Sequence, residues 1–392
     1  MPLFPEKDNK KKGTQIELDS TTYDPSPPDP IELDFLTSYY AQDGNNGAVT
    51  GGIGTEKLTD YTSKVILKIP MTKELGLNVD AGFDYYSSAS TDLIDNVFSG
   101  ESSSDMRVHG NVGVSYKLSP QQTFGLRVGG SREYDYTSFN TGFNYGWESK
   151  DHNTSIGVSG QAFIDKWKLI YPTELRRQGA LVPTDKRQSY NGSLTISHVL
   201  NKRMQASVQL EGIYMNGLLS TPFHRVFFQE QDAAKVEQLP GTRLKIPIGV
   251  RFNYHATDWL IAKLYYRYYW DDWGVTAHTA SVELPVKINR FLSVYPFYRY
   301  HTQTAADYFQ PYKQHTLDEE FYTSDYDLSK LQSHTYGAGI RYSPVNGLAR
   351  MKLPFKERPV LMVKSIDVKY SHYDRSTGLK ADIISLGLSF SF

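Results

Sequence analysis

Apolar and polar residues alternate along most of this chain. Between Leu75 and Tyr86, an apolar side chain stands at nearly every second position, with Gly, Asn and Asp between. Side chains of a β-strand point alternately to its two faces, so this period of two predicts a strand with one apolar and one polar face. The same period returns at 106–118, 243–254, 259–270 and 384–392.

The links between these stretches show a second pattern. Counting from a strand near 32–41, the sequence predicts about sixteen strands, an even number. Short links mostly alternate with long ones. The long links lie at about 43–57, 88–104, 166–187, 219–242 and 306–331. A link at about 344–358 is long where a short one is expected. The pattern is typical of an all-β fold, a transmembrane antiparallel up-and-down β-barrel with short periplasmic turns and long extracellular loops.

A soluble β-protein is the competing interpretation. A propeller would show a repeat of roughly 40 residues with recurrent motifs, and the sequence shows none. A soluble sandwich of 392 residues would divide into domains, but no linker follows residue 30. Both observations favour the membrane barrel.

Composition agrees with this view. The net charge is −1, and the chain has 29 tyrosines and no cysteine. Its mean hydropathy of −0.48 is compatible with a barrel, since half of each strand is polar. No apolar run is long enough for a membrane-spanning helix. The missing cysteines exclude disulfides and thiolate metal sites, and the balanced charge gives no case for nucleic-acid binding.

The N-terminal region differs from the rest. Residues 1–30 are charged, rich in proline and poor in apolar side chains, which predicts a flexible periplasmic tail before a barrel over 31–392. The first residues lack the features of a secretory signal. We therefore expect the signal of an exported protein to be absent from this version of the sequence.

Two local features refine the strands. Pro247 falls within a predicted strand, where it removes a backbone donor, so we expect a bulge there. Aromatic residues gather near strand ends, as amphipathic rings do at membrane boundaries. The outer-rim group is Tyr85, Tyr86, Tyr134, Tyr136, Tyr268, Tyr269, Trp270 and Trp273, and the inner-rim group is Tyr116, Tyr254, Trp259 and Tyr342.

The chain ends on an alternating strand. Ile384, Leu386, Leu388, Phe390 and Phe392 share one face. This strand and its terminal Phe392 resemble the signal by which the barrel assembly machinery recognises outer-membrane barrels. The expectation is an apolar face toward outer-membrane lipids and a backbone edge paired with the first strand, because hydrocarbon tolerates no unpaired edge.

Two segments carry a family resemblance. "DFLTSYYAQDGNNGAVTGGIGTEKLTD" (Asp34–Asp60) resembles the N-terminal signature of an uncharacterised family of bacterial outer-membrane barrels, a domain of unknown function. "EFYTSDYDLSKLQSHTYGAGIRYSP" (Glu320–Pro344) is similar to a second segment of that family. The resemblance implies a barrel in the outer membrane of a Gram-negative bacterium, and no activity.

Loop motifs offer little chemistry. The cluster at 43–47 is rich in oxygen ligands but lacks the spacing of a calcium loop, so a turn is favoured over a metal site. The glycines at 51–54 do not match a phosphate-binding fingerprint. Glu319, Glu320, Asp325 and Asp327 are interpreted as a solvated acidic surface. We expect no metal and no cofactor.

Catalysis is also not predicted. His301 and His334 are the histidines weighed for a rim hydrolase. Neither belongs to a recognisable set of nucleophile, base and orienting group. The sequence therefore predicts a protein that is not an enzyme.

The predicted lumen carries the leading hypothesis. If apolar positions face lipid, a basic wall faces inward, with acidic residues across the lumen. The candidate residues are Arg243, Lys245, Arg251, Lys263, Arg267 and Arg299, opposed by Asp80 and Asp84. Such walls orient polar solutes and favour anions, although the charges could equally pair with one another or with loops.

These residues predict a channel for small polar or anionic solutes. The alternative is a non-catalytic outer-membrane scaffold whose loops or N-terminal tail bind a periplasmic or surface partner in the cell envelope.

Overall fold

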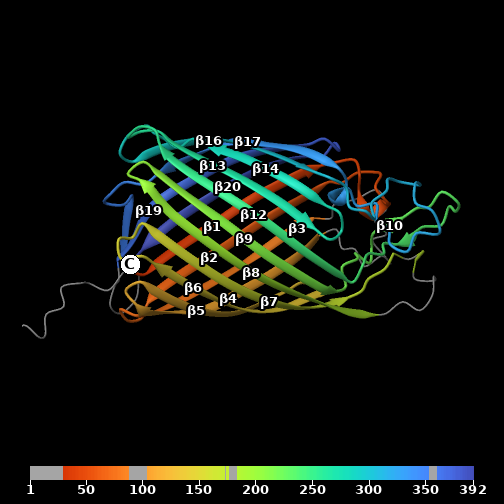
Figure 1. Cartoon of the computed structure of the whole chain (residues 1–392), viewed down its shortest axis with the longest axis horizontal. Coiled ribbons are helices and arrows are strands. Elements are labelled where there is room, and N and C mark those ends of the chain that lie inside the picture. The colour runs from red at the N-terminus through yellow and green to blue at the C-terminus, as the bar shows by residue number, and fades with distance from the viewer. Residues whose placement is uncertain (1–29, 88–103, 173, 176–182, 353–359) are drawn as a thin grey trace, which may run out of the picture.

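The computed structural model describes residues 30–87, 104–172, 174–175, 183–352 and 360–392. Sixteen antiparallel strands form one closed barrel (Figure 1). They are β1 (Glu32–Asp43), β2 (Leu58–Pro70), β3 (Leu75–Ser87), β4 (Ser104–Ser119), β5 (Gln122–Arg132), β6 (Tyr136–Glu148), β7 (Thr154–Lys168), β8 (Thr184–Asn201), β9 (Met204–Gly217), β12 (Thr242–His255), β13 (Ile261–Asp271), β14 (Thr276–Glu283), β16 (Leu292–Gln303), β17 (Leu331–Tyr342), β19 (Val360–Arg375) and β20 (Lys380–Ser391).

Six short elements lie in the links. They are the strands β10 (Arg225–Val226), β11 (Lys235–Val236), β15 (Val286–Lys287) and β18 (Ala349–Lys352), and the 3₁₀ turns η1 (Ala48–Thr50) and η2 (Tyr326–Leu328). The predicted number of barrel strands is confirmed. The predicted tail falls on residues 1–29, which lie outside the described residues.

Pairing of the first and last strands closes the barrel. β1 and β20 run antiparallel in register from Glu32 opposite Ser391 to Asp43 opposite Lys380. Each barrel strand thus pairs on both sides. Closure gives the backbone N–H and C=O groups partners within the protein, which a hydrocarbon environment requires.

The alternation of the sequence separates lipid from lumen. Opposite residues in an antiparallel pair share a face, so Leu210 of β9 lies with Leu194 of β8 and Ile248 of β12 on the outer surface. Large apolar side chains are exposed there around the barrel, including Leu126, Phe139, Val208 and Ile384. Because no protein layer covers them, they form the lipid-facing surface of a membrane barrel. No helix in the described part of the chain is long and apolar enough to cross a membrane.

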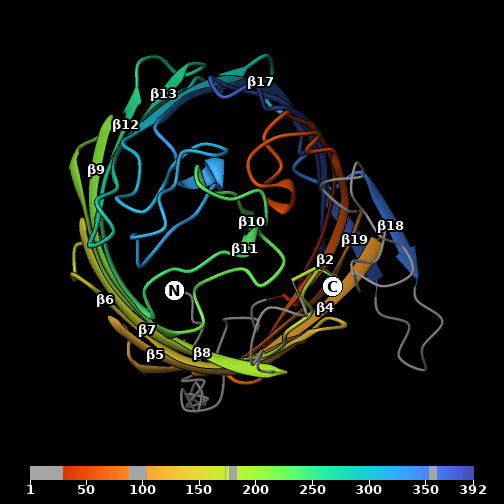
Figure 2. The ribbon, with the colours of Figure 1, turned by 90° about the vertical axis from the view of Figure 1, so that its right-hand side faces the viewer.

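The two ends of the barrel differ. One end carries the short links 71–74, 120–121, 149–153, 202–203 and 256–260. The other carries most of the long links, of which 44–57, 218–241 and 304–330 enter the ring of strands (Figure 2), while the long link between β17 and β19 lies at the first end. We call these three loops the cap. The sequence therefore predicted where most of the long links lie and left open whether they fold inward.

One sequence-based expectation is wrong. β12 keeps one register on both sides of Pro247, with Lys245 opposite Ile213 and Ile248 opposite Leu210, so no bulge is inserted. The proline points into the lumen and is buried, and only the ladder pairing with β9 is interrupted. Four of the outer-rim aromatics lie near strand ends with their side chains toward the lumen, because they stand at inward register positions or in an inward turn: Tyr86, Tyr136, Tyr269 and Trp273.

We expect Leu210→Arg to destabilise the barrel by about 2–4 kcal/mol, the cost of a cation at the bilayer midplane. Gln209→Arg, one residue away but facing the lumen, should cost about 1 kcal/mol, the value of one hydrogen bond. Urea titrations in lipid vesicles measure both. Equal losses would show that the two faces are assigned wrongly.

Candidate functional site: a basic lumen wall beneath a loop cap

The six predicted basic residues lie on the inner face of three strands, β12, β13 and β16, of which the last is separated from β13 by β14. In β12 and β13, Arg251 lies opposite Tyr265, and Gly249 lies opposite Arg267. Across β14, Arg299 of β16 lies opposite Ser281. The alternation that sends Val250 and Tyr266 toward lipid sends these cations inward. The structure therefore brings the predicted residues together on β12, β13 and β16.

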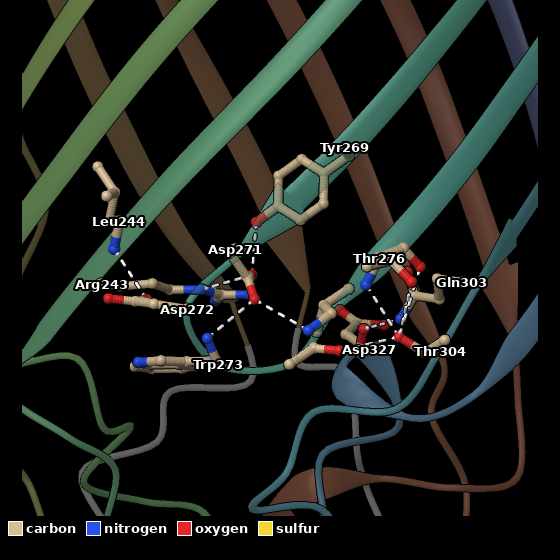
Figure 3. A network of polar contacts seen from close by, with 12 residues as sticks. Arg243, Leu244, Tyr269, Asp271, Asp272, Trp273, Thr276, Gln303, Thr304 and Asp327 are labelled. Carbon is tan, nitrogen blue, oxygen red and sulfur yellow. Dashed lines mark hydrogen bonds and ion pairs between the residues drawn. The ribbon is translucent and has the colours of Figure 1, made fainter.

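Asp271 organises the end of this wall nearest the cap (Figure 3). Its buried carboxylate accepts hydrogen bonds from Arg243 Nε at 3.0 Å and from the Tyr269 hydroxyl at 2.7 Å. Two backbone amides, of Trp273 at 3.1 Å and Val275 at 3.0 Å, complete the set. The Arg243 guanidinium also lies 4.2 Å from the centre of the Trp273 ring. Arg243 is thus committed to structure and not free to hold a solute.

Other cations of the wall are paired to different degrees. Lys263 lies 2.8 Å from Glu283, whereas Arg267 lies 3.7 Å from Glu211. Lys245, Arg251 and Arg299 have no carboxylate within 4.0 Å among the described residues. Arg251 instead lies 5.2 Å from the centre of the Tyr265 ring. The wall therefore carries an excess of positive charge that neighbouring side chains do not cancel.

Sequence reasoning missed further lumen cations, of which two extend this side of the barrel. Arg341 of β17 pairs with Asp367 at 2.9 Å, and the Lys369 ammonium lies 4.1 Å from the centre of the Phe297 ring. Both line two adjoining hollows, of about 500 and 460 Å³. The period of two in "GAGIRY" (337–342) and "DVKYSHY" (367–373) places Arg341 and Lys369 on the inner face, so the sequence held the signal that could have found them. Together with the six predicted residues they make what we call the basic wall.

The predicted acidic residues lie across the barrel. β3, which carries Asp80 and Asp84, is eight strand positions from β13 in the sixteen-strand ring. Asp80 pairs with Lys64 at 3.0 Å, and Asp84 lies 3.7 Å from His109. The side facing the basic wall thus holds acidic residues that contact basic side chains of the adjacent strands, Lys64 and His109.

The cap above this lumen has its own apolar core. Val226 and Phe228 of loop 218–241 pack with Tyr322 of loop 304–330, and all three are buried. The Phe228 and Tyr322 rings meet edge to face with centroids 4.9 Å apart. Arg225 joins the third loop by donating to Val49 O at 2.6 Å. The three loops therefore pack as one unit.

Two glycines permit this packing. Gly51 and Gly52 both have positive φ, at 81° and 86°. A Cβ on Gly51 would stand 2.6 Å from the Phe227 ring, and one on Gly52 would stand 2.8 Å from Ser324 O. These glycines, interpreted from sequence as turn residues, are required by close contact between cap loops.

Arg375, at the end of β19, anchors two cap loops to the barrel. This buried guanidinium lies 2.5 Å from Asp327 of loop 304–330 and 3.6 Å from Glu56 of loop 44–57. Gln303 holds the first of these loops as well, donating to Asp327 O at 2.9 Å (Figure 3). Arg375 thus links both loops to the barrel, and it is not part of the basic wall.

The interpretation as a solvated acidic surface holds for Asp327, whose side chain is 72% exposed, and is corrected for Asp325. Asp327 pairs with Arg375, and Asp325 accepts from Asp327 N at 2.9 Å and faces the cap interior near His224 and Glu237. The two histidines weighed for catalysis lie on opposite faces. His301 bonds Thr279 inside the lumen, and His334 bonds the Tyr298 hydroxyl on the outer surface.

A family match accompanies this geometry. The model described as "Protein of unknown function (DUF3570)" matches residues 80–352, well over half of the chain. The chain belongs to the DUF3570 family. The segment Glu320–Pro344, in which the resemblance was noticed, lies almost entirely in strands and cap loops of the matched range. No curated protein matches the sequence significantly.

Several solved structures are similar in overall shape. A bacterial polysaccharide outer membrane secretin is 11% identical, with 94% of this chain and 100% of that chain covered and a TM-score of 0.47. The siderophore receptor PirA from Acinetobacter baumannii is 9% identical, covering 87% and 53%, with a TM-score of 0.45. OccK1 (OpdK) from Pseudomonas aeruginosa is 7% identical, covering 92% and 98%, with a TM-score of 0.42.

Glu56 should make docking of loop 44–57 depend on pH. Burial raises the pKa of Glu56 to about 7, with Arg375 opposing the shift and Asp327 and Asp325 adding to it. A carboxyl with a higher pKa in the docked loop holds its proton more tightly there, so docking is favoured at low pH and weakens as the pH rises toward 7. Hydrogen exchange of residues 44–57, corrected for intrinsic rates, should show severalfold lower protection at pH 7.5 than at pH 5.5.

Glu56→Gln is the matched variant, since it keeps the shape of the side chain and cannot ionise. It should lose the part of the pH dependence that lies between the ordinary pKa of a glutamate, 4.5, and the raised pKa of about 7. An unchanged profile in Glu56→Gln would contradict this role for the carboxyl.

Proposed function

We propose that this DUF3570 barrel lies in the outer membrane of a Gram-negative bacterium and conducts small anionic or polar solutes, with its short turns toward the periplasm. The observation that supports it best is the set of lumen cations without carboxylate partners. Arg251, Arg299 and Lys369 stand on one side of the lumen, and anions are attracted to positive groups lining a pore.

The shape of the lumen supports the same proposal. The hollows beside Lys369 and Arg341 lie among small hydroxyl side chains, Ser365, Ser385 and Ser389. Hydroxyls donate hydrogen bonds to anionic oxygens without adding charge. A smaller cavity of about 190 Å³ lies beneath the cap and is lined by Arg267 and Arg299 of the wall and by Asp327 of the cap.

The cap then acts as the selective entrance. Its loops fill the mouth of the barrel (Figure 2), so a solute must pass between them and the basic wall, or move them. Such a path restricts passage to small solutes. Arg375 and Gln303 hold the cap to the barrel strands, so their contacts set how readily the cap moves.

Charge reversal tests the anion preference. The double variant Arg251→Glu and Arg299→Glu should shift the reversal potential of planar bilayers in a KCl gradient toward cation selectivity. Two charges near a permeating ion each contribute about 1 kcal/mol at 4 Å even in water, a severalfold effect on permeability. Lys150→Glu, in an exposed turn outside the lumen, should leave selectivity unchanged. An open pore whose selectivity ignores both lumen charges would refute the proposal.

A scaffold is the second candidate, favoured by the packed cap. The apolar core of Val226, Phe228 and Tyr322 resembles a small folded unit that closes the mouth and presents a surface. A scaffold with a plugged lumen gives no single-channel current in the wild type or after Arg375→Ala. Discrete current steps that grow in Arg375→Ala would instead support the channel.

A further inference from the structure

Three metal-ligating side chains meet inside the cap. His224 and Glu237 come from loop 218–241, and Asp325 comes from loop 304–330. One ligand atom from each lies within 4.8 Å of the others. The group sits where two cap loops that are distant in sequence join, and none of its residues belongs to the basic wall.

The backbone fixes the two loops at this junction. Gln238 and Tyr322 exchange backbone hydrogen bonds, at 3.1 Å and 2.7 Å, which align residues 237 and 323. Glu237 N also donates to His224 O at 3.1 Å. The positions of the three side chains are therefore set by backbone bonds that do not involve the side chains themselves.

The carboxylates are oriented but not saturated. Glu237 accepts from Thr221 N at 2.6 Å and from the Thr323 hydroxyl at 2.5 Å, and Asp325 accepts from Asp327 N at 2.9 Å. His224 Nδ1 stands 3.4 Å from Glu237 Oε1, longer than a well-formed hydrogen bond. Lone pairs therefore remain on all three groups.

Charge balance gives the second line of evidence. The Glu237 side chain is 2% exposed, and buried carboxylates are normally paired with a cation or bound to a metal. No Lys or Arg of the described chain lies within 4.0 Å of Glu237 or Asp325. Arg375 is engaged by Asp327 and Glu56, and Arg225 by Glu174. Only the weakly basic His224 faces the two carboxylates.

We propose that His224, Glu237 and Asp325 bind a divalent transition-metal ion that joins two loops of the cap. One imidazole nitrogen with two carboxylates suits Zn²⁺ and its neighbours, whereas Ca²⁺ and Mg²⁺ prefer oxygen ligands alone. Three protein ligands leave a position for water. This proposal departs from the sequence-based expectation that the chain holds no metal.

Binding of Zn²⁺ to the full chain tests the site. The protein, purified in detergent and stripped with chelator, should bind one Zn²⁺ per chain in isothermal titration calorimetry. His224→Ala should weaken that binding at least tenfold, and Glu237→Gln and Asp325→Asn should each weaken it. Co²⁺ alone should give a visible d–d absorption that His224→Ala abolishes.

His152→Ala is the matched control. His152 forms an exposed pair with Glu148 at 3.0 Å at the opposite end of the barrel, and its loss should leave Zn²⁺ affinity unchanged. Heat-modifiable mobility in gels verifies that each variant keeps the barrel fold. If His224→Ala does not fold, Asp325→Asn takes its place in the comparison of Zn²⁺ affinity. Undetectable Zn²⁺ binding in the wild type, or equal binding in the wild type and the cap variants, would overturn the proposal.

Discussion

This structure depends on one constraint: hydrocarbon has no hydrogen-bonding groups, so every backbone N–H and C=O within it must find a partner in the protein. A strand edge exposed to hydrocarbon would leave N–H and C=O groups unpaired at several kcal/mol each. The ladder between β1 and β20 removes that edge. With the ring closed, side chains alternate between lipid and lumen, and the polar half of each strand gains a wet interior. The basic wall, the opposed acidic residues and the space for a cap all follow from closure.

The sequence predicted this framework well, for a physical reason. A period of two is a local signal, and the lipid on one side imposes it on every strand alike. It therefore placed Arg251 and Arg267 inward, Val250 and Tyr266 outward, and the number of strands correctly. Tyr269 stands near the rim, as predicted, and its inward position brings its hydroxyl to Asp271.

The cap was beyond sequence reasoning because its contacts are non-local. His224 and Asp325 are about a hundred positions apart, and no periodicity links them. Asp327 in isolation is typical of a solvated surface, and only the fold shows that Arg375 meets it. Pro247 shows the converse: a local rule predicted a bulge, but pairing with β13 on the other side kept the strand in register. Loops thus carry the features that most distinguish this barrel from a plain pore.

The shared anchor at Arg375 has a consequence for the dynamics of the mouth. Because one guanidinium engages both Asp327 and Glu56, releasing either loop leaves the same buried cation with half of its partners, and so weakens the hold on the other. The two loops are then coupled thermodynamically, and partly detached states are disfavoured. Movement of the mouth should be cooperative, switching between two levels instead of passing through a graded series.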